Sequence, residues 1–159
     1  VVYEAELNSY APLGVEATIT NTAVITANVV TPITVRETIN AEEQSLLTIT
    51  KSVSPVPVTE NGTLTYTFVI QNLGNTAATE ETGVVITDTF NPVLKNLTAT
   101  FNGTAWTEGA DYTYDEITGM FASVAGKITV PAATYTQDTT TGAWGINPGV
   151  STLVISGTV

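Results

Sequence analysis

The sequence contains no cysteine and no histidine, and these two absences exclude several kinds of chemistry. Disulfide bonds, thiol catalysis, Cys/His zinc sites and Ser-His-Asp hydrolysis all require residues that the chain lacks. Basic residues are also scarce, since four Lys and Arg stand against fifteen Asp and Glu, for a net charge of −11. So acidic a chain has little with which to bind phosphates or an anionic membrane surface. We therefore expect no enzyme, no cofactor or metal, and no nucleic-acid partner.

Long apolar runs are absent as well, and none approaches the length of a membrane span, so we expect no membrane insertion. No signal peptide is visible, and a chain that starts at Val1 is expected to be a mature or trimmed product. Contiguous helix formers are scarce, whereas Thr, Val, Ile, Tyr and Phe dominate the periodic segments, as is typical of strands. These features together predict an exported, all-β structural or adhesive protein.

Alternation of apolar and polar residues predicts where most strands lie and which face of each is apolar. The predicted inward rows are Val15, Ala17, Ile19, Asn21, Ala23 and Ile25; Leu47, Ile49, Lys51 and Val53; Leu64, Tyr66, Phe68 and Ile70; and Val84, Ile86, Asp88 and Phe90. Further short strands are expected at 97–101, 105–106, 126–130, 132–136 and 151–159. Many short strands with Gly- and Asn-rich turns favour a β-sandwich.

The first 45 residues differ in composition from the rest of the chain. We expect a hairpin of Val1–Leu7 with Gly14–Thr26, joined to the main domain by a linker, Ala27–Ser45. Pro32 and the charged run Arg36–Gln44 indicate that this connection is a linker or an edge segment and not a core strand. The predicted organisation is therefore an N-terminal arm and linker over 1–45 and a sandwich over 46–159.

Three polar residues occupy positions where the alternation requires an apolar side chain, namely Asn21, Lys51 and Asp88. A buried charge is costly unless it is paired, neutralised or chemically altered. A Lys, an Asn and an acid that face one core are the parts of a spontaneous isopeptide bond. The neutral amine of Lys51 would attack the Asn21 carboxamide while Asp88 polarises the carbonyl and shuttles the proton, and ammonia would leave. Burial favours the uncharged forms that this reaction needs.

Two other interpretations of these residues remain open. Lys51 and Asp88 can form a buried ion pair, with Asn21 hydrogen-bonded to the backbone. A register slip of one residue would instead turn all three side chains outward.

Several motifs resemble the DUF11 family of bacterial surface repeats. They are Leu47-Thr-Ile-Thr-Lys51-Ser-Val, Asn61-Gly62-Thr-Leu-Thr-Tyr66-Thr, Gln71-Asn72-Leu-Gly74-Asn75-Thr-Ala and Val84-Val-Ile-Thr-Asp88-Thr. Near the start of the chain, Ala11-Pro12-Leu-Gly14 and Ile19-Thr-Asn21-Thr-Ala23 resemble the end of such a repeat. The resemblance implies an immunoglobulin-like sandwich on an exported protein. The order Lys, Asp and a late Asn also resembles the CnaA-type isopeptide domains of Gram-positive adhesins and pilins.

The chain departs from this pattern because the strand that carries Asn21 precedes the domain instead of following it. The sandwich therefore lacks its last strand and carries the one that a neighbour needs, which predicts strand donation between identical subunits. The expected function is a subunit of an extracellular bacterial fibre, a pilus or spore appendage, located on the cell or spore surface. A circular permutation, in which residues 1–27 fold back onto their own domain, is the competing explanation.

Two other functions are kept as alternatives. One is a stalk repeat of a large cell-wall or S-layer adhesin, cut from a longer chain. The other is a carbohydrate-binding module that stacks a sugar on Trp106 or Trp144.

Overall fold

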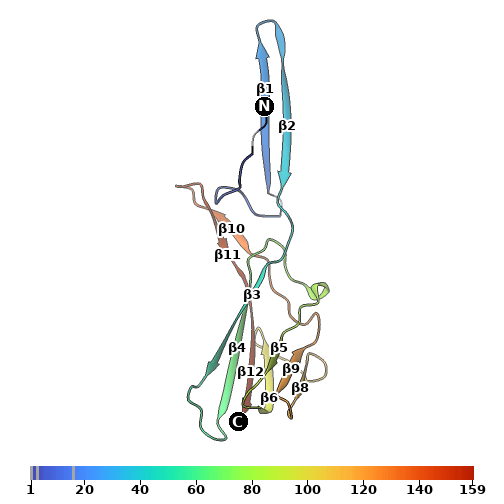
Figure 1. The fold of residues 1–159 in the computed structure, drawn as a ribbon, viewed down its shortest axis with the longest axis vertical. Helices are drawn as coiled ribbons and strands as arrows, with labels where there is room; N and C mark the ends of the chain where they lie inside the picture. The colour runs from blue at the N-terminus through green and yellow to red at the C-terminus, as the bar shows by residue number, and fades with distance from the viewer. Residues whose placement is uncertain (1, 3, 16) are drawn as a thin grey trace.

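The computed structural model describes residues 2, 4–15 and 17–159, and it confirms the predicted all-β class (Figure 1). The strands are β1 (Thr18–Ala27), β2 (Val30–Asn40), β3 (Leu47–Ser54), β4 (Thr63–Asn72), β5 (Thr87–Thr89), β6 (Lys95–Phe101), β7 (Thr104–Ala105), β8 (Tyr112–Asp115), β9 (Met120–Ser123), β10 (Thr134–Gln137), β11 (Trp144–Asn147) and β12 (Gly149–Thr158). Over the described ranges, the one helical element is a 3-10 turn, Glu80–Thr82. No helix in this part of the chain is long and apolar enough to cross a membrane.

Two antiparallel sheets form the main body, consistent with a β-sandwich. The larger sheet has the strand order β3-β4-β12-β6-β7, and the smaller has the order β5-β9-β8. Between them lies a core whose largest fully buried side chains include Phe90, Phe121, Leu153 and Ile155. Its aromatic rings contact one another, with Tyr66 and Phe90 centroids 4.7 Å apart and Tyr112 and Phe121 centroids 5.3 Å apart.

The predicted apolar rows of the central strands are confirmed. In β4, Leu64, Tyr66, Phe68 and Ile70 are 3–7% exposed, while Thr65 and Thr67 between them are half-buried. Residues that alternate along a strand face opposite sides of the sheet, so this row forms the floor of the core. The strands expected at 97–101 and 105–106 correspond to β6 and β7, and the turn Asn102-Gly103, with φ of 48° and 80°, joins them.

The N-terminal arm is a long two-stranded ribbon of β1 and β2 that extends away from the sandwich (Figure 1). Its register pairs Ile19 with Ile39, Ala23 with Val35 and Ile25 with Ile33, so one face of the ribbon is apolar. Most of that face is uncovered in the described structure, since Ile25, Ile33, Val35 and Ile39 are each more than half exposed. At the base of the ribbon, Ile19 is half-buried and lines a pocket with Leu7 and Leu13.

Two sequence predictions were wrong in detail. The partner of β1 is β2, within the expected linker, whereas the described residues of 1–7 form no strand; Val1 and Tyr3 lie outside the described residues. Pro32 is tolerated because a β-bulge interrupts the ladder between Ile25 and Ala27, beside it. The expected strand at 126–130 is irregular, with one isolated bridge from Val130 to Ala78, although Ile128 and Val130 are buried.

The arm joins the sandwich at a junction built on two buried asparagines. Asn72 Oδ1 accepts the N–H groups of Leu46 and Gly74, each at 2.9 Å, and Asn72 Nδ2 donates to Thr76 O at 2.7 Å. Asn75 Oδ1 accepts the Gln44 N–H at 3.0 Å, and its Nδ2 donates to Glu42 O at 2.8 Å and to Leu13 O at 3.1 Å.

A glycine is required at the same junction. A Cβ on Gly74 would lie 2.1 Å from Gln44 O and 2.7 Å from Leu46 N, closer than any real contact. The motif Asn72-Leu-Gly74-Asn75 therefore acts as a clamp on the segment 42–46, which leads from the arm into β3.

Candidate functional site

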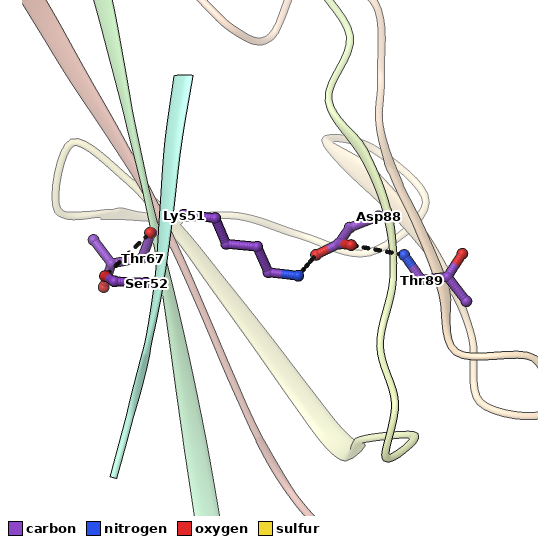
Figure 2. A network of polar contacts seen from close by, with 5 residues as sticks. All are labelled: Lys51, Ser52, Thr67, Asp88 and Thr89. Carbon is purple, nitrogen blue, oxygen red and sulfur yellow. Dashed lines mark hydrogen bonds and ion pairs between the residues drawn. The ribbon is translucent and has the colours of Figure 1, made fainter. Parts of the chain in front are cut away.

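The structure brings together two of the three residues that the sequence singled out. Lys51 Nζ on β3 and Asp88 Oδ2 on β5 form an ion pair that spans the gap between the two sheets (Figure 2). Both side chains point inward, as the alternation predicted, so the register slip is ruled out for these two strands. The Lys51 side chain is 40% exposed and that of Asp88 is 19% exposed, so the pair lies at the rim of the core.

Aromatic rings surround the amine of Lys51. Its Nζ lies 4.7 Å from the ring centroid of Tyr66, 5.4 Å from that of Phe90 and 5.5 Å from that of Phe68. The faces of these rings attract the cation and also exclude water from it on that side. Lys51 is thus held in one place, with its terminal nitrogen directed at the acid.

The two oxygens of Asp88 have different environments. Oδ1 accepts the N–H of Thr89 at 2.9 Å, which fixes the carboxylate (Figure 2). Oδ2 is buried and contacts the Lys51 ammonium, which is its ion-pair partner. Each carboxylate oxygen can accept more than one hydrogen bond, so this acid can accept a further one from an incoming amide.

Beside this pair, one side of the sandwich is open. Ile49, Lys51 and Val53 on β3 stand opposite Ile70, Phe68 and Tyr66 on β4, so the two rows share one face. The β4 row is 3–7% exposed, but Ile49 is 51% and Val53 is 40% exposed. The difference arises because the three-stranded sheet ends at β5 and places no strand over β3.

An apolar groove runs along this open side. It encloses about 320 Å³ and is lined by Leu47, Thr48, Ile49 and Ile70 from the larger sheet. Its other side is formed by Thr87 on β5 and by Val84, Val85 and Ile86, which lead into β5. Both strands beside it, β3 and β5, end their sheets and have one free edge. The groove therefore has the lining and the unpaired edges that an added strand requires.

Asn21, the third predicted residue, is not at this site. It lies in β1, where it pairs with Glu37 and is exposed to solvent. The arm that carries it extends away from the sandwich, so the chain is not folded back as a circular permutation would require (Figure 1). Within one molecule, this arrangement brings no carboxamide of the arm to Lys51.

The two tryptophans do not form a common platform. Trp106 is half-buried and stacks on Phe101, with ring centroids 5.3 Å apart, so it packs against the core. Trp144 lies on β11, in a separate two-stranded sheet, and its backbone N–H donates to Ser9 O at 2.7 Å. Across the described ranges, no group of three or more acidic residues has a metal-binding arrangement.

The open groove was not located by sequence reasoning, although the exposed row on β3 is part of a predicted strand. Alternation shows which face of a strand is apolar, but it does not show whether another strand covers that face. The motif Asn72-Leu-Gly74-Asn75 carries the sequence signal for the junction, but the motif alone does not show that its side chains bind the segment 42–46.

Comparison with known proteins adds no family assignment. No protein-family model matches the chain, no curated protein sequence matches it, and no solved structure matches its fold. The resemblance to DUF11 and CnaA-type domains therefore stays a prediction from the motifs.

Proposed function

We propose that this protein is the structural subunit of an extracellular fibre in which each copy inserts its arm into the open groove of the next copy. The observation that carries the proposal is a complementary pair of uncovered surfaces. The arm has an exposed apolar row and no partner, and the sandwich has an exposed inward row and no covering strand. Burying apolar surface is the main driving force for association, and each surface supplies what the other lacks.

The geometry of one chain favours an open polymer over a closed pair. The arm and the far end of the sandwich lie at opposite ends of the long axis (Figure 1). A contact between two different surfaces propagates from copy to copy unless a rotation closes it into a ring. The net charge of −11 would keep such polymers from associating laterally without control.

A covalent link can follow once the arm is inserted. The bond would form between Lys51 Nζ of the acceptor and the side-chain carbonyl carbon of Asn21 from the donor. The Lys51 amine loses a proton, the Asn21 carbonyl carbon exchanges its amide nitrogen for Nζ, and one ammonia leaves; Asp88 carries the proton from amine to leaving group. The product is a neutral amide, which removes the desolvation cost of a buried lysine charge.

The test is denaturing mass spectrometry of assembled material after boiling in detergent, together with electron microscopy before boiling. We expect fibres, and covalent multimers that lack one ammonia per junction. Lys51→Ala and Asn21→Ala should abolish the multimers, whereas Lys95→Ala, at an exposed lysine on β6, should leave them unchanged.

Other outcomes separate the parts of this proposal. Fibres that boil to full-mass monomer would contradict the isopeptide bond but support strand donation. A monomer that is lighter by one ammonia would mean that the bond closes within one chain. Monomers in native buffer at every concentration would contradict fibre assembly and favour a repeat that needs its neighbours in a longer polypeptide.

A further inference from the structure

The open side of the sandwich offers two free edges, β3 and β5, and the choice between them determines how a subunit is completed. We infer that the arm of a second copy adds to the edge of β5, with β1 next to β5 and antiparallel to it, and with Asn21 opposite Asp88. This inference rests on the proposed function and specifies its interface.

The exposed apolar row on β3 favours addition of the arm at the edge of β5 over addition at the edge of β3. Sheets in a sandwich pack about 10 Å apart, and strands within a sheet lie about 4.8 Å apart. A strand added to β5 extends the smaller sheet over the inner face of β3, where it covers Ile49 and Val53. A strand added to β3 lies beside that row and leaves its inner face exposed.

The backbone of β5 is free on the side away from β9. The C=O of Ile86 accepts the Ser123 N–H and the N–H of Phe90 donates to Gly119 O, so these residues direct their backbone groups toward β9 and its turn. By alternation, Thr87 and Thr89 direct theirs toward the open edge. The Thr89 N–H is bonded to Asp88 Oδ1 from its own chain, a local substitute for a strand partner.

The polar residue within the apolar row of each arm strand indicates that β1, and not β2, pairs with β5. The row on β1 carries Asn21 between Ile19 and Ala23, whereas the matching row on β2 carries Glu37. Asn21 opposite Asp88 would place a neutral amide beside the carboxylate, whose oxygens can each accept a further hydrogen bond. Glu37 at the same place would set a second carboxylate beside Asp88, and like charges directly opposite each other in a sheet are destabilising.

Chain direction selects the antiparallel orientation. β3 and β5 run in the same direction. Leu47 and Ile49 lie across the groove from Val84–Thr87, and further along both segments Lys51 lies beside Asp88. β3 runs from the junction toward the far end of the molecule, while β1 runs from the junction toward the tip of the arm (Figure 1). In a stack of equally oriented copies, β1 of one copy is therefore antiparallel to β5 of the next.

This register sets Ala23 and Ile25 against the apolar groove. With Asn21 opposite Asp88, Ala23 lies opposite Ile86 and Ile25 lies opposite Val84. Ile86 and Val84 both line the groove. On the outer face, Thr22 lies opposite Thr87. Neighbouring Cα atoms at such a position are about 5.5 Å apart, within the range that a disulfide accepts.

Disulfide mapping tests this register, and the absence of native cysteine makes it free of background. Three double variants are oxidised after assembly, digested and searched by mass spectrometry for disulfide-linked peptides. They are Thr22→Cys/Thr87→Cys for the inferred interface, Thr22→Cys/Thr50→Cys for the β3 edge, and Thr38→Cys/Thr87→Cys for an arm docked through β2. Mixing isotope-labelled and unlabelled chains identifies the links that form between copies.

We expect the Thr22/Thr87 pair to cross-link between copies at least tenfold more than either of the other pairs. A dominant Thr22/Thr50 link would overturn the choice of edge, and a dominant Thr38/Thr87 link would overturn the choice of strand. Fibres from the unsubstituted chain with no link in any variant would also overturn the interface while leaving assembly intact. If the unsubstituted chain forms no fibres in the same buffer, the proposed function fails, and this inference fails with it.

Discussion

β4 in the sandwich and β1 in the arm are both ten-residue strands in which apolar side chains alternate with polar ones. The apolar row of β4 is almost completely buried, whereas in β1 only Ile19 is even half-buried. The two strands differ in what lies opposite them, since β4 faces a second sheet and β1 faces solvent. An isolated two-stranded ribbon is marginally stable in water, so an arm of this length is expected to gain its stability from a partner.

The largest expected effect comes from truncating a side chain in the covered region. Phe121 is fully buried, and Phe121→Ala should lower the free energy of unfolding by about 3–5 kcal/mol. In the arm, Ile33→Ala removes a side chain that is 56% exposed and should change the monomer by less than about 0.5 kcal/mol. Urea unfolding of the monomer measures both. A loss of several kcal/mol for Ile33→Ala would show that the arm is already packed in the monomer.

A smaller effect is expected at the junction between the two regions. Asn72→Ala would leave the N–H groups of Leu46 and Gly74 and the carbonyl of Thr76 without their partner. Leaving buried groups unsatisfied costs about 1–3 kcal/mol, and we expect a loss within that range. Hydrogen exchange should accelerate at Leu46 and Gly74 while staying unchanged in β12. Unchanged exchange at those two residues would contradict the clamp.

The ion pair should contribute less again. Lys51→Ala leaves the Asp88 carboxylate beside the aromatic rings without its counter-charge, but both side chains are partly exposed. Its effect should lie between that of a surface pair and that of a buried one, at about 1–2 kcal/mol in the monomer. Lys95→Ala is the matched control, with a change below about 0.5 kcal/mol. A double-mutant cycle with Asp88→Asn should show a coupling between the two sites, and additive losses would contradict the pair.

The smallest effect is the dependence of stability on acid pH. The Thr107 N–H, and then Lys127, hold the pKa of Asp111 below its usual range, and the N–H groups of Thr141 and Thr140 do the same for the pKa of Asp138. A lowered folded pKa stabilises the protein above the unfolded value of about 3.9, and this stabilisation is lost as pH falls through the folded pKa. Unfolding temperature should therefore fall below about pH 4. Asp138→Asn keeps an acceptor for its turn and should reduce that slope; an unchanged slope would contradict the assignment.

Much of the sandwich could be predicted from the chain because alternation determines which residues share a face. The inward rows of β4 and of 84–90, and the meeting of Lys51 with Asp88, follow from that rule and are confirmed. β2 was missed because Pro32 and nearby charges resemble a linker, and a bulge that accommodates a proline has no clear sequence signal. The position of Asn21 depends on whether the arm folds back or extends, which alternation within one strand does not determine.

The path of the chain from the arm into β3 has a mechanical consequence. In a fibre linked as proposed, each subunit is covalently held at two points, Asn21 in its own arm and Lys51 in its groove. Tension along the fibre would then pass from Asn21 through β2 and the clamped segment 42–46 to Lys51, and would leave the chain there. Residues 52–159, with almost the whole core, lie outside that path. The sandwich would thus surround and protect the cross-link without bearing the load. Residues 21–51, about a fifth of the polypeptide, would bear the tension.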